Sequence, residues 1–409
     1  MNKFRPLSHT FFSRFLLISC LVLGFSLLQP APVFAQDDST TVKKPVITVL
    51  LPLQLDSLFS YGEYKHGQAI PKATLPYLEF YNGVQMAAEF LRRDGIEAHI
   101  QIVDTRKKGS VSASLQISYL KNPSLVIGVA QNTTDLREMA AYADKFSVPF
   151  ISASYPNDGG LKATDHLYIL NSTLKTHCYG VYKYLQRNHS TEPLLLITRK
   201  GNVESFLKST LDEAAANSPS VKLKWKVVTL PDSFNTQQVK ALLDSNRKNI
   251  IIGATMDMAF SQRLIKTVAA QKPNYETLIV GMPNWDGIKL KGADYKGSEI
   301  VFGTPFVSSS ANIDLYNEIV KHYSQKQNSK PSDMAIRGYE TVYRFAKTLQ
   351  RWPNSIEFTE HINNDVYQVF CDFNFEPVMD KDNPKQVNYF ENKKLYFIKL
   401  VDGQLHSIY

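Results

Sequence analysis

The chain has 409 residues, 44% of them hydrophobic, which is more than one ordinary domain and enough for two sizeable cores. Its formal net charge at pH 7 is +8, from 46 Lys and Arg against 38 Asp and Glu. These charges are scattered along the sequence and no basic–aromatic patch occurs, which argues against a nucleic-acid partner.

The first 35 residues have the layout of a secretory signal peptide. Basic residues precede an apolar run over residues 15–28, and small residues lead up to Ala35. The apolar run is too short and wrongly flanked for a transmembrane helix, and no later segment approaches membrane-spanning length. We therefore expect cleavage after Ala35, a polar linker over residues 36–45, and a periplasmic or secreted mature protein.

The three cysteines each leave an alternative open. Residues 17–20 (LISC) resemble a lipoprotein box with Cys20 as the lipidated residue. Cleavage there would leave the apolar segment LVLGFSLL at the mature end, so release after Ala35 is favoured. Cys178 and Cys371 either form one disulfide in an oxidising compartment or remain two separate buried thiols.

Buried strands and amphipathic helices alternate through the first half. Short apolar runs predict the strands, and residues 54–78 show no clear period. The expected strands are residues 46–53, 98–103, 125–128, 149–152 and 167–170, and the expected helices are residues 81–93, 111–120 and one that begins near Asn132. This alternation is typical of a parallel, doubly wound α/β sheet.

The same alternation starts again after residue 170. The expected helices are residues 175–187, 203–216, 236–245 and 258–271, and the expected strands are residues 194–198, 223–230, 250–253, 277–281 and 300–303. Two more helices are expected at residues 312–325 and 333–351. The tail, residues 366–409, reads as an antiparallel addition. We predict two Rossmann-like α/β halves.

One stretch of the first half carries candidate binding groups. N-cap oxygens at the start of a helix are offered by Asn132, Thr133 and Thr134. The free N–H groups at such a helix start attract a carboxylate or other anion. Ser152, Ser154 and Tyr155 place hydroxyls after the next strand, and ligands in open α/β sheets lie at such strand ends. The alternative is an ordinary βαβ unit whose hydroxyls only cap helices.

Catalytic signatures are absent from the sequence. It holds no G-x-S-x-G, H-E-x-x-H, C-x-x-C or G-x-x-x-x-G-K-[ST] motif, and no two histidines have metal-ligand spacing. His177 and Cys178 are adjacent, but neighbours in a helix point to different faces. Asp104 and Asp286 follow strands, where an acid either binds a ligand or forms a cap or turn. We expect no enzyme, no metal and no cofactor.

Six segments in order resemble a known family. They are ITVLLPL, FYNGVQMAAEFL, HIQIVDTR, SLVIGVAQNTTDL, VPFISASYP and MAIRGYETVYRFAKTL. The order is similar to that of type I periplasmic binding proteins, more narrowly the leucine/isoleucine/valine-binding receptors of ABC transporters. The resemblance implies two lobes joined by three hinge strands.

The resemblance also implies domain boundaries. The N-terminal lobe would hold residues 46–170 plus 306–352, and the C-terminal lobe residues 171–305 plus 366–409. The three crossings between the lobes would be residues 168–176, residues 303–310 and a stretch within residues 354–372.

Site residues follow from the resemblance by position. The first lobe of the family holds a ligand carboxylate, and the matching residues here are Gln131, Asn132, Thr133, Ser152, Ala153 and Ser154. The second lobe of the family supplies acids that hold an amino group. This chain has Leu174 and Lys175 at one such place and Pro283, Asn284 and Trp285 at the other, so the acids are missing or displaced. Lys175 and Trp285 would suit an anion, a sugar or an aromatic ligand better.

Two functional hypotheses remain. The first is an exported receptor that binds a small solute, such as an amino acid, for an ABC transporter permease. The second is a cell-envelope scaffold or regulator on the same fold, like the activators of peptidoglycan synthases, with no small ligand. Such relatives often carry a peptidoglycan-binding LysM module, which this chain lacks. An enzyme is disfavoured because no reacting group has a partner.

Overall fold

The structure is a computed structural model that describes residues 44–67, 69–288, 295, 299–307, 312–401 and 404–408. The expected signal peptide and cleavage site, together with residues 36–43 of the expected linker, lie outside the described residues. Within the described ranges, no helix is both long enough and apolar enough to cross a membrane.

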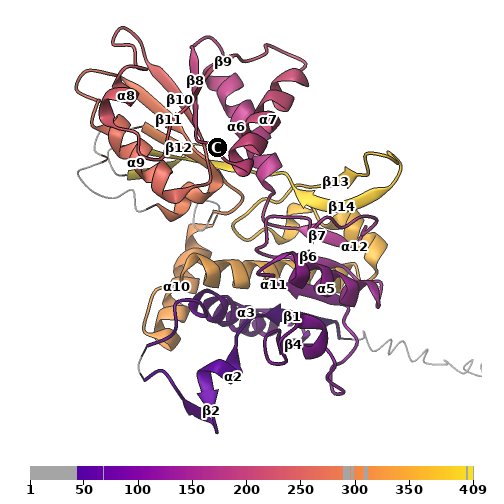
Figure 1. Cartoon of the computed structure of the whole chain (residues 1–409). Coiled ribbons are helices and arrows are strands. Elements are labelled where there is room, and N and C mark those ends of the chain that lie inside the picture. Colours follow the sequence, from indigo (N-terminus) through magenta and orange to yellow (C-terminus); the bar gives the residue numbers. More distant parts are fainter. Residues whose placement is uncertain are drawn as a thin grey trace, which may run out of the picture. The chain divides into compact units, whose positions relative to one another are not determined.

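The first lobe is built on a seven-stranded sheet (Figure 1). The strands, in order across the sheet, are β13 (Phe375–Met379), β14 (Val387–Asn392), β7 (Leu167–Ile169), β6 (Phe150–Ser152), β5 (Leu125–Gly128), β1 (Val46–Leu51) and β4 (His99–Asp104). Neighbours run parallel except β13, which is antiparallel to β14. The helices of this lobe are α3 (Leu75–Arg93), α4 (Val111–Ser114), α5 (Thr133–Asp144), α10 (Ile313–Gln327), α11 (Asp333–Arg351) and α12 (Ser355–His361).

The second lobe repeats this architecture. Its strands, in order across the sheet, are β16 (Gln404–Ser407), β15 (Tyr396–Val401), β12 (Glu299–Thr304), β11 (Thr277–Val280), β10 (Asn249–Ala254), β8 (Leu194–Thr198) and β9 (Trp225–Thr229). Its helices are α6 (Leu174–Asn188), α7 (Asn202–Ala216), α8 (Thr236–Lys240), α9 (Met258–Ala269) and the 3-10 helix η1 (Pro283–Gly287). The strands β8 to β12 run parallel, and β15 and β16 are antiparallel additions.

The expected order of strands and helices is confirmed, and several boundaries are wrong. Helix α3 begins at Leu75, six residues before residue 81, because Pro76 fits the first turn of a helix. Residues 54–74 are not featureless: they hold the one-turn helix α2 (Leu55–Leu58) and the hairpin of β2 (Phe59–Ser60) and β3 (Glu63–Tyr64). The helices expected at residues 111–120 and 236–245 shorten to α4 and α8.

The tail divides between the two sheets, although we expected all of residues 366–409 in the second lobe. Strand β14 pairs with β7 of the first sheet, whereas β15 pairs with β12 of the second (Figure 1). The third crossing therefore lies between β14 and β15, at residues 393–395, and not within residues 354–372. The physical reason is apolar packing, since Phe358, Phe370 and Phe373 are buried in the core of the first lobe.

Helices α3 and α11 approach each other through two glycines. A Cβ atom at Gly83 would lie 2.0 Å from the carbonyl oxygen of Ala335, and one at Gly338 would lie 2.2 Å from the carbonyl oxygen of Phe80. The two backbones are therefore in direct contact at both points. Apolar faces of both helices complete this contact, including Val84 and Tyr339.

The two described cysteines are separate thiols. Cys178 is buried in the core of the second lobe and Cys371 in that of the first, and neither forms a disulfide. Burial raises the pKa of the Cys178 thiol to about 12, so it stays protonated and poorly nucleophilic at neutral pH.

Candidate functional site

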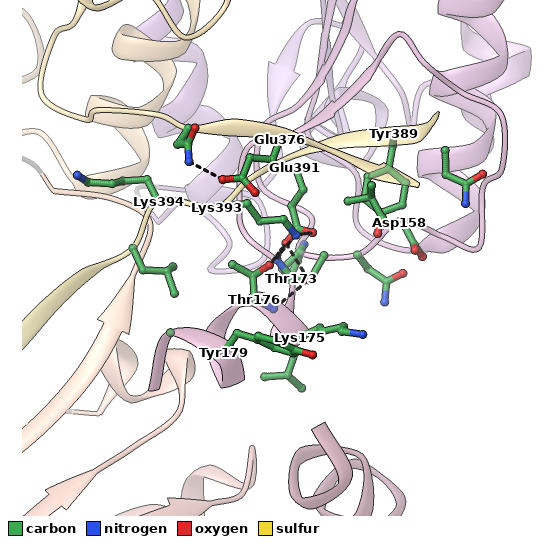
Figure 2. A pocket seen from close by; sticks show the side chains of 18 of the residues that line it. Asp158, Thr173, Lys175, Thr176, Tyr179, Glu376, Tyr389, Glu391, Lys393 and Lys394 are labelled. Carbon is green, nitrogen blue, oxygen red and sulfur yellow. Dashed lines mark hydrogen bonds and ion pairs between the residues drawn. The ribbon is translucent and has the colours of Figure 1, made fainter. Parts of the chain in front are cut away.

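A pocket of about 1700 Å³ lies beside the hinge and is lined by both lobes (Figure 2). Helices α6 and α7 of the second lobe contribute Lys175, Tyr179 and Phe206. The first lobe contributes Tyr389 and Glu376 from its β13–β14 hairpin. Its volume exceeds the range of about 300–1,000 Å³ that is usual for drug-sized ligands. The lining includes residues of both lobes and of the first and third crossings, such as Thr173 and Lys393.

Glu391 forms the centre of the hinge beside this pocket (Figure 2). Its carboxylate accepts hydrogen bonds from the backbone N–H of Thr173 at 2.8 Å and from the hydroxyls of Thr173 at 2.8 Å and Thr176 at 2.6 Å. Lys393 Nζ lies 2.5 Å from the second carboxylate oxygen and donates to Thr176 at 3.0 Å. The start of α6 is thereby tied to the third crossing.

The charge on Glu391 is maintained despite its burial. Its side chain is only 2% exposed. Burial alone would raise the pKa, but the charge and hydrogen bond of Lys393, with the bonds from Thr176 and Thr173, lower it below its ordinary value. The carboxylate is therefore ionised at neutral pH, and the hinge depends on a buried ion pair.

Backbone contacts strengthen the same junction. Ser172 donates its hydroxyl hydrogen to the carbonyl of Asn392 at 2.6 Å, and the Asn392 amide donates to the carbonyl of Leu170 at 3.2 Å. The first and third crossings thus form one hydrogen-bonded unit. The second crossing, at residues 305–307, is held instead to Cys371 of the first lobe through Val307.

His177 is buried where α6 meets β12. A side chain at Gly303 of β12 would lie 3.5 Å from its Nδ1. Burial lowers the pKa of His177 to about 4, against the charge of Glu391, which raises it. The ring is therefore neutral at pH 7.

Acidification is expected to destabilise the fold through His177. Between its ordinary pKa of 6.5 and about 4, the unfolded chain binds a proton that the folded chain does not, so stability falls as pH falls. We expect a loss of about 2 kcal/mol between pH 7 and pH 5 from this residue. In urea titrations, the free energy of unfolding of His177→Leu should fall by about 2 kcal/mol less than that of the wild type between pH 7 and pH 5. His406→Leu, which removes an exposed histidine, should match the wild type. Equal slopes in all three proteins would contradict the assignment.

At the strand ends of the first lobe, the expected ligand-binding residue Gln131 is held by residues that the sequence did not single out for the site. Gln131 accepts from the Arg106 guanidinium at 2.7 and 2.9 Å and donates to the Tyr77 hydroxyl at 2.9 Å. Arg106 also pairs with Asp135 at 2.6 Å, and this carboxylate accepts the backbone N–H of Gln131 at 3.0 Å. The donors of Arg106 are thus directed at its own neighbours.

The other first-lobe candidates have mixed positions. Asn132 caps α5 through its side chain, and Thr133 shares a hydrogen bond of 3.0 Å with the Tyr155 hydroxyl. Ser152 and Ala153 are 0% and 1% exposed, and the Ser152 hydroxyl has no hydrogen-bond partner among the described residues. The carbonyl of the partly buried Ser154 accepts from Asn171 at 2.7 Å. None of these residues lines the pocket.

The two second-lobe candidates separate. Lys175 lines the pocket and pairs with Glu213 of α7 at 2.8 Å. Trp285 is 0% exposed and belongs to the core of the second lobe, so its placement at a ligand was wrong. Its indole lies against Gly281 and Gly253, where a Cβ atom would be 2.1 and 2.7 Å away. The absence of a side chain at these two glycines leaves room for the ring, which the sequence did not reveal.

Asp104 is one of the two acids considered from the sequence. Asp104 accepts backbone N–H groups of Gln54 at 3.1 Å and Leu55 at 2.8 Å, so it anchors the loop after β1. Sequence reasoning missed Glu391 because its partner Thr173 is 218 positions away. In the described ranges, no group of three or more His, Cys, Asp or Glu side chains could hold a metal ion.

Comparisons with known proteins identify the fold. The sequence matches no protein-family model and no curated protein. Among solved structures, a protein from Rhodospirillum rubrum named as a branched-chain amino acid ABC transporter is 12% identical, covers 89% of this chain and 100% of its own, and has a TM-score of 0.64. A branched-chain amino acid ABC transporter periplasmic ligand-binding protein from Burkholderia xenovorans is 10% identical, covers 90% and 95%, and has a TM-score of 0.58.

A third similar structure contains a ligand. It is an ABC transporter substrate-binding protein from Desulfitobacterium hafniense in complex with Leu, 12% identical, covering 90% of this chain and 100% of its own, with a TM-score of 0.54. At this level of identity the likeness concerns the fold. The expected type I periplasmic-binding-protein fold, with two α/β lobes, is confirmed.

Proposed function

We propose that this chain is an exported, non-catalytic receptor that binds a small solute between its two lobes and delivers it to an ABC transporter permease. The observation that carries the proposal is the pocket of about 1700 Å³ lined by both lobes and by two hinge crossings. Hinge bending around such a pocket traps a ligand when each lobe supplies part of the site.

The proposed binding groups come from both lobes. Lys175 lines the pocket and adds a cation. The first-lobe candidates are Gln131, Asn132, Thr133, Ser154 and Tyr155, which lie at strand ends outside the pocket. Ser152 and Ala153 would act from behind, as buried supports of these residues. Amino acids and related solutes are the ligand class that the solved neighbours support. The expected signal peptide, cut after Ala35, would carry the receptor to the periplasm, with lipidation at Cys20 as the alternative.

One observation favours a second function. The side chains of Gln131, Arg106 and Asp135 already satisfy one another, which leaves fewer donors for a ligand carboxylate. An envelope scaffold or regulator with a ligand-free fold would need no such donors. It would dock a protein partner instead of a solute.

The two functions differ in what a ligand does to the protein. A receptor should melt at a higher temperature with its solute, since a ligand that binds only the folded state stabilises it by about 2.7 kcal/mol at 100 times Kd. Small-angle scattering should show a smaller radius of gyration in the same solution. Branched-chain amino acids, dipeptides and sugars form the panel, and native mass spectrometry of the purified protein detects a carried ligand. Repeated emptiness without any thermal shift would favour the scaffold.

A further inference from the structure

Arg337 of α11 differs from Arg106 in having no hydrogen bond or ion pair among the described residues. Its guanidinium carbon lies 3.9 Å from the centre of the Phe306 ring, in the second crossing between the lobes. Its Nε is buried without a hydrogen-bond partner. Within the described ranges, no hydrogen bond or ion pair engages the rest of this guanidinium. The residue as a whole is partly buried, and the cost of an unpartnered donor applies to its buried Nε–H.

The surroundings hold both groups in place before any ligand arrives. Phe306 is fixed because its backbone N–H donates to the Thr304 hydroxyl at 3.2 Å, and the next residue, Val307, donates to the Cys371 sulfur at 3.3 Å. Arg337 precedes Gly338, at which α11 is in backbone contact with α3. The backbone that carries each group is therefore held, and the cation and the ring are already in contact with one another, which lowers the entropy lost on binding.

Three carboxylates act on Arg337 from a distance. Asp333 and Glu340 lie on α11 itself, and Asp286 belongs to η1 of the second lobe. None of them makes an ion pair within 4.0 Å of it among the described contacts. Burial raises the pKa of Asp286, with Arg337 acting in the opposite direction, so the two charges influence each other without direct pairing. Nearby negative charges thus act on the guanidinium, while its N–H donors form no hydrogen bond among the described residues.

We propose that Arg337 and Phe306, neither of which lines the pocket beside the hinge, form a separate subsite for the carboxylate group of a solute; the proposal rests on the proposed receptor function. The planar guanidinium donates two parallel hydrogen bonds to the carboxylate. The adjoining apolar part of the solute packs against the edge of the Phe306 ring left free by the arginine. Because this subsite lies where α11, the second crossing and η1 of the other lobe meet, an anion bound there would link ligand binding to the movement of the lobes.

Matched acid and amide pairs test the subsite. The probes are leucine against leucinamide and 3-phenylpropanoate against 3-phenylpropanamide, each titrated by thermal shift and calorimetry at pH 7. The wild type should bind an acid at least tenfold more tightly than its amide. Arg337→Met should weaken the acid about ten- to hundredfold, the range for losing hydrogen bonds to a charged group. Arg337→Lys, which keeps the charge without the fork, should fall between them.

Arg351→Met is the control, because it removes an exposed arginine from the same helix. It should bind like the wild type. If circular dichroism shows that Arg337→Met folds poorly, the binding of acids and amides is measured in Arg337→Lys and Phe306→Leu instead. Equal binding of acid and amide by the wild type, or acid binding within threefold of wild type in Arg337→Met, overturns the subsite while leaving the receptor intact. If no probe binds and no molecule co-purifies, the receptor function itself fails, and the subsite with it.

Discussion

Replacing Gly338 with alanine is expected to lower the free energy of unfolding by about 3 kcal/mol or more, at the upper end of what overpacking costs. The new methyl group would lie 2.2 Å from the Phe80 carbonyl oxygen, a backbone atom that cannot turn aside. Alanine favours a helix over glycine by only about 1 kcal/mol, so packing decides the sign. Gly83→Ala should behave alike, because its methyl would lie 2.0 Å from the Ala335 carbonyl oxygen.

Urea unfolding monitored by circular dichroism measures this effect. Gly287→Ala is the matched control, since the nearest described neighbour of its methyl would be the end of the Met258 side chain, at 3.5 Å. That is ordinary van der Waals contact, and the control should stay within about 0.5 kcal/mol of wild type. If Gly338→Ala were as stable as the control, the backbone contact between α3 and α11 would be refuted.

Replacing Glu391 with alanine is expected to cost about 3 kcal/mol. The substitution leaves Lys393 without its partner and removes the acceptor of the Thr173 and Thr176 donors. Breaking a fully buried ion pair costs about 3–5 kcal/mol, and the lower value applies because the Lys393 side chain is 28% exposed. Glu376→Ala removes an exposed carboxylate from the same hairpin and should change stability little.

The effect of Glu391 also has a pH signature. Because the folded pKa lies below the ordinary 4.5, its contribution is fully present above pH 4.5 and is lost as pH falls through the lowered value. Glu391→Gln should therefore be less stable than wild type at pH 7 and approach it in acid. A constant difference between the two proteins from pH 7 to pH 3 would argue that the carboxylate is not the group that matters.

Much of the fold could be predicted because buried parallel strands read as uninterrupted apolar runs. Runs such as residues 125–128 and 194–198 are interior strands with a neighbour on each side, and every residue of both runs is buried. The tail was harder, because alternating residues identify an antiparallel strand but not the sheet that receives it. The choice for β14 depends on phenylalanines such as Phe373, whose partners lie far away in the sequence.

The candidate site could be predicted less well than the fold. The sequence identified the strand-end residues, including Gln131 and Thr133, but not that Arg106 would engage the first of them. Trp285 follows a strand and reads as a loop aromatic, whereas two glycines allow it to fold into the core. Arg337 occupies an ordinary helical position, and only the approach of Phe306 distinguishes it.

The division of the tail makes both lobes depend on the last stretch of chain. The first sheet lacks β13 and β14 until residue 392 is present, and the second lacks β15 and β16. A chain shortened before Phe375 would leave β7 as a bare edge with unpaired backbone groups, open to pairing with other chains. In the first lobe, β7 pairs with β14, and most of the second lobe lies between these two strands in the sequence. Folding of the first lobe therefore depends on contacts of large sequence separation, which form slowly.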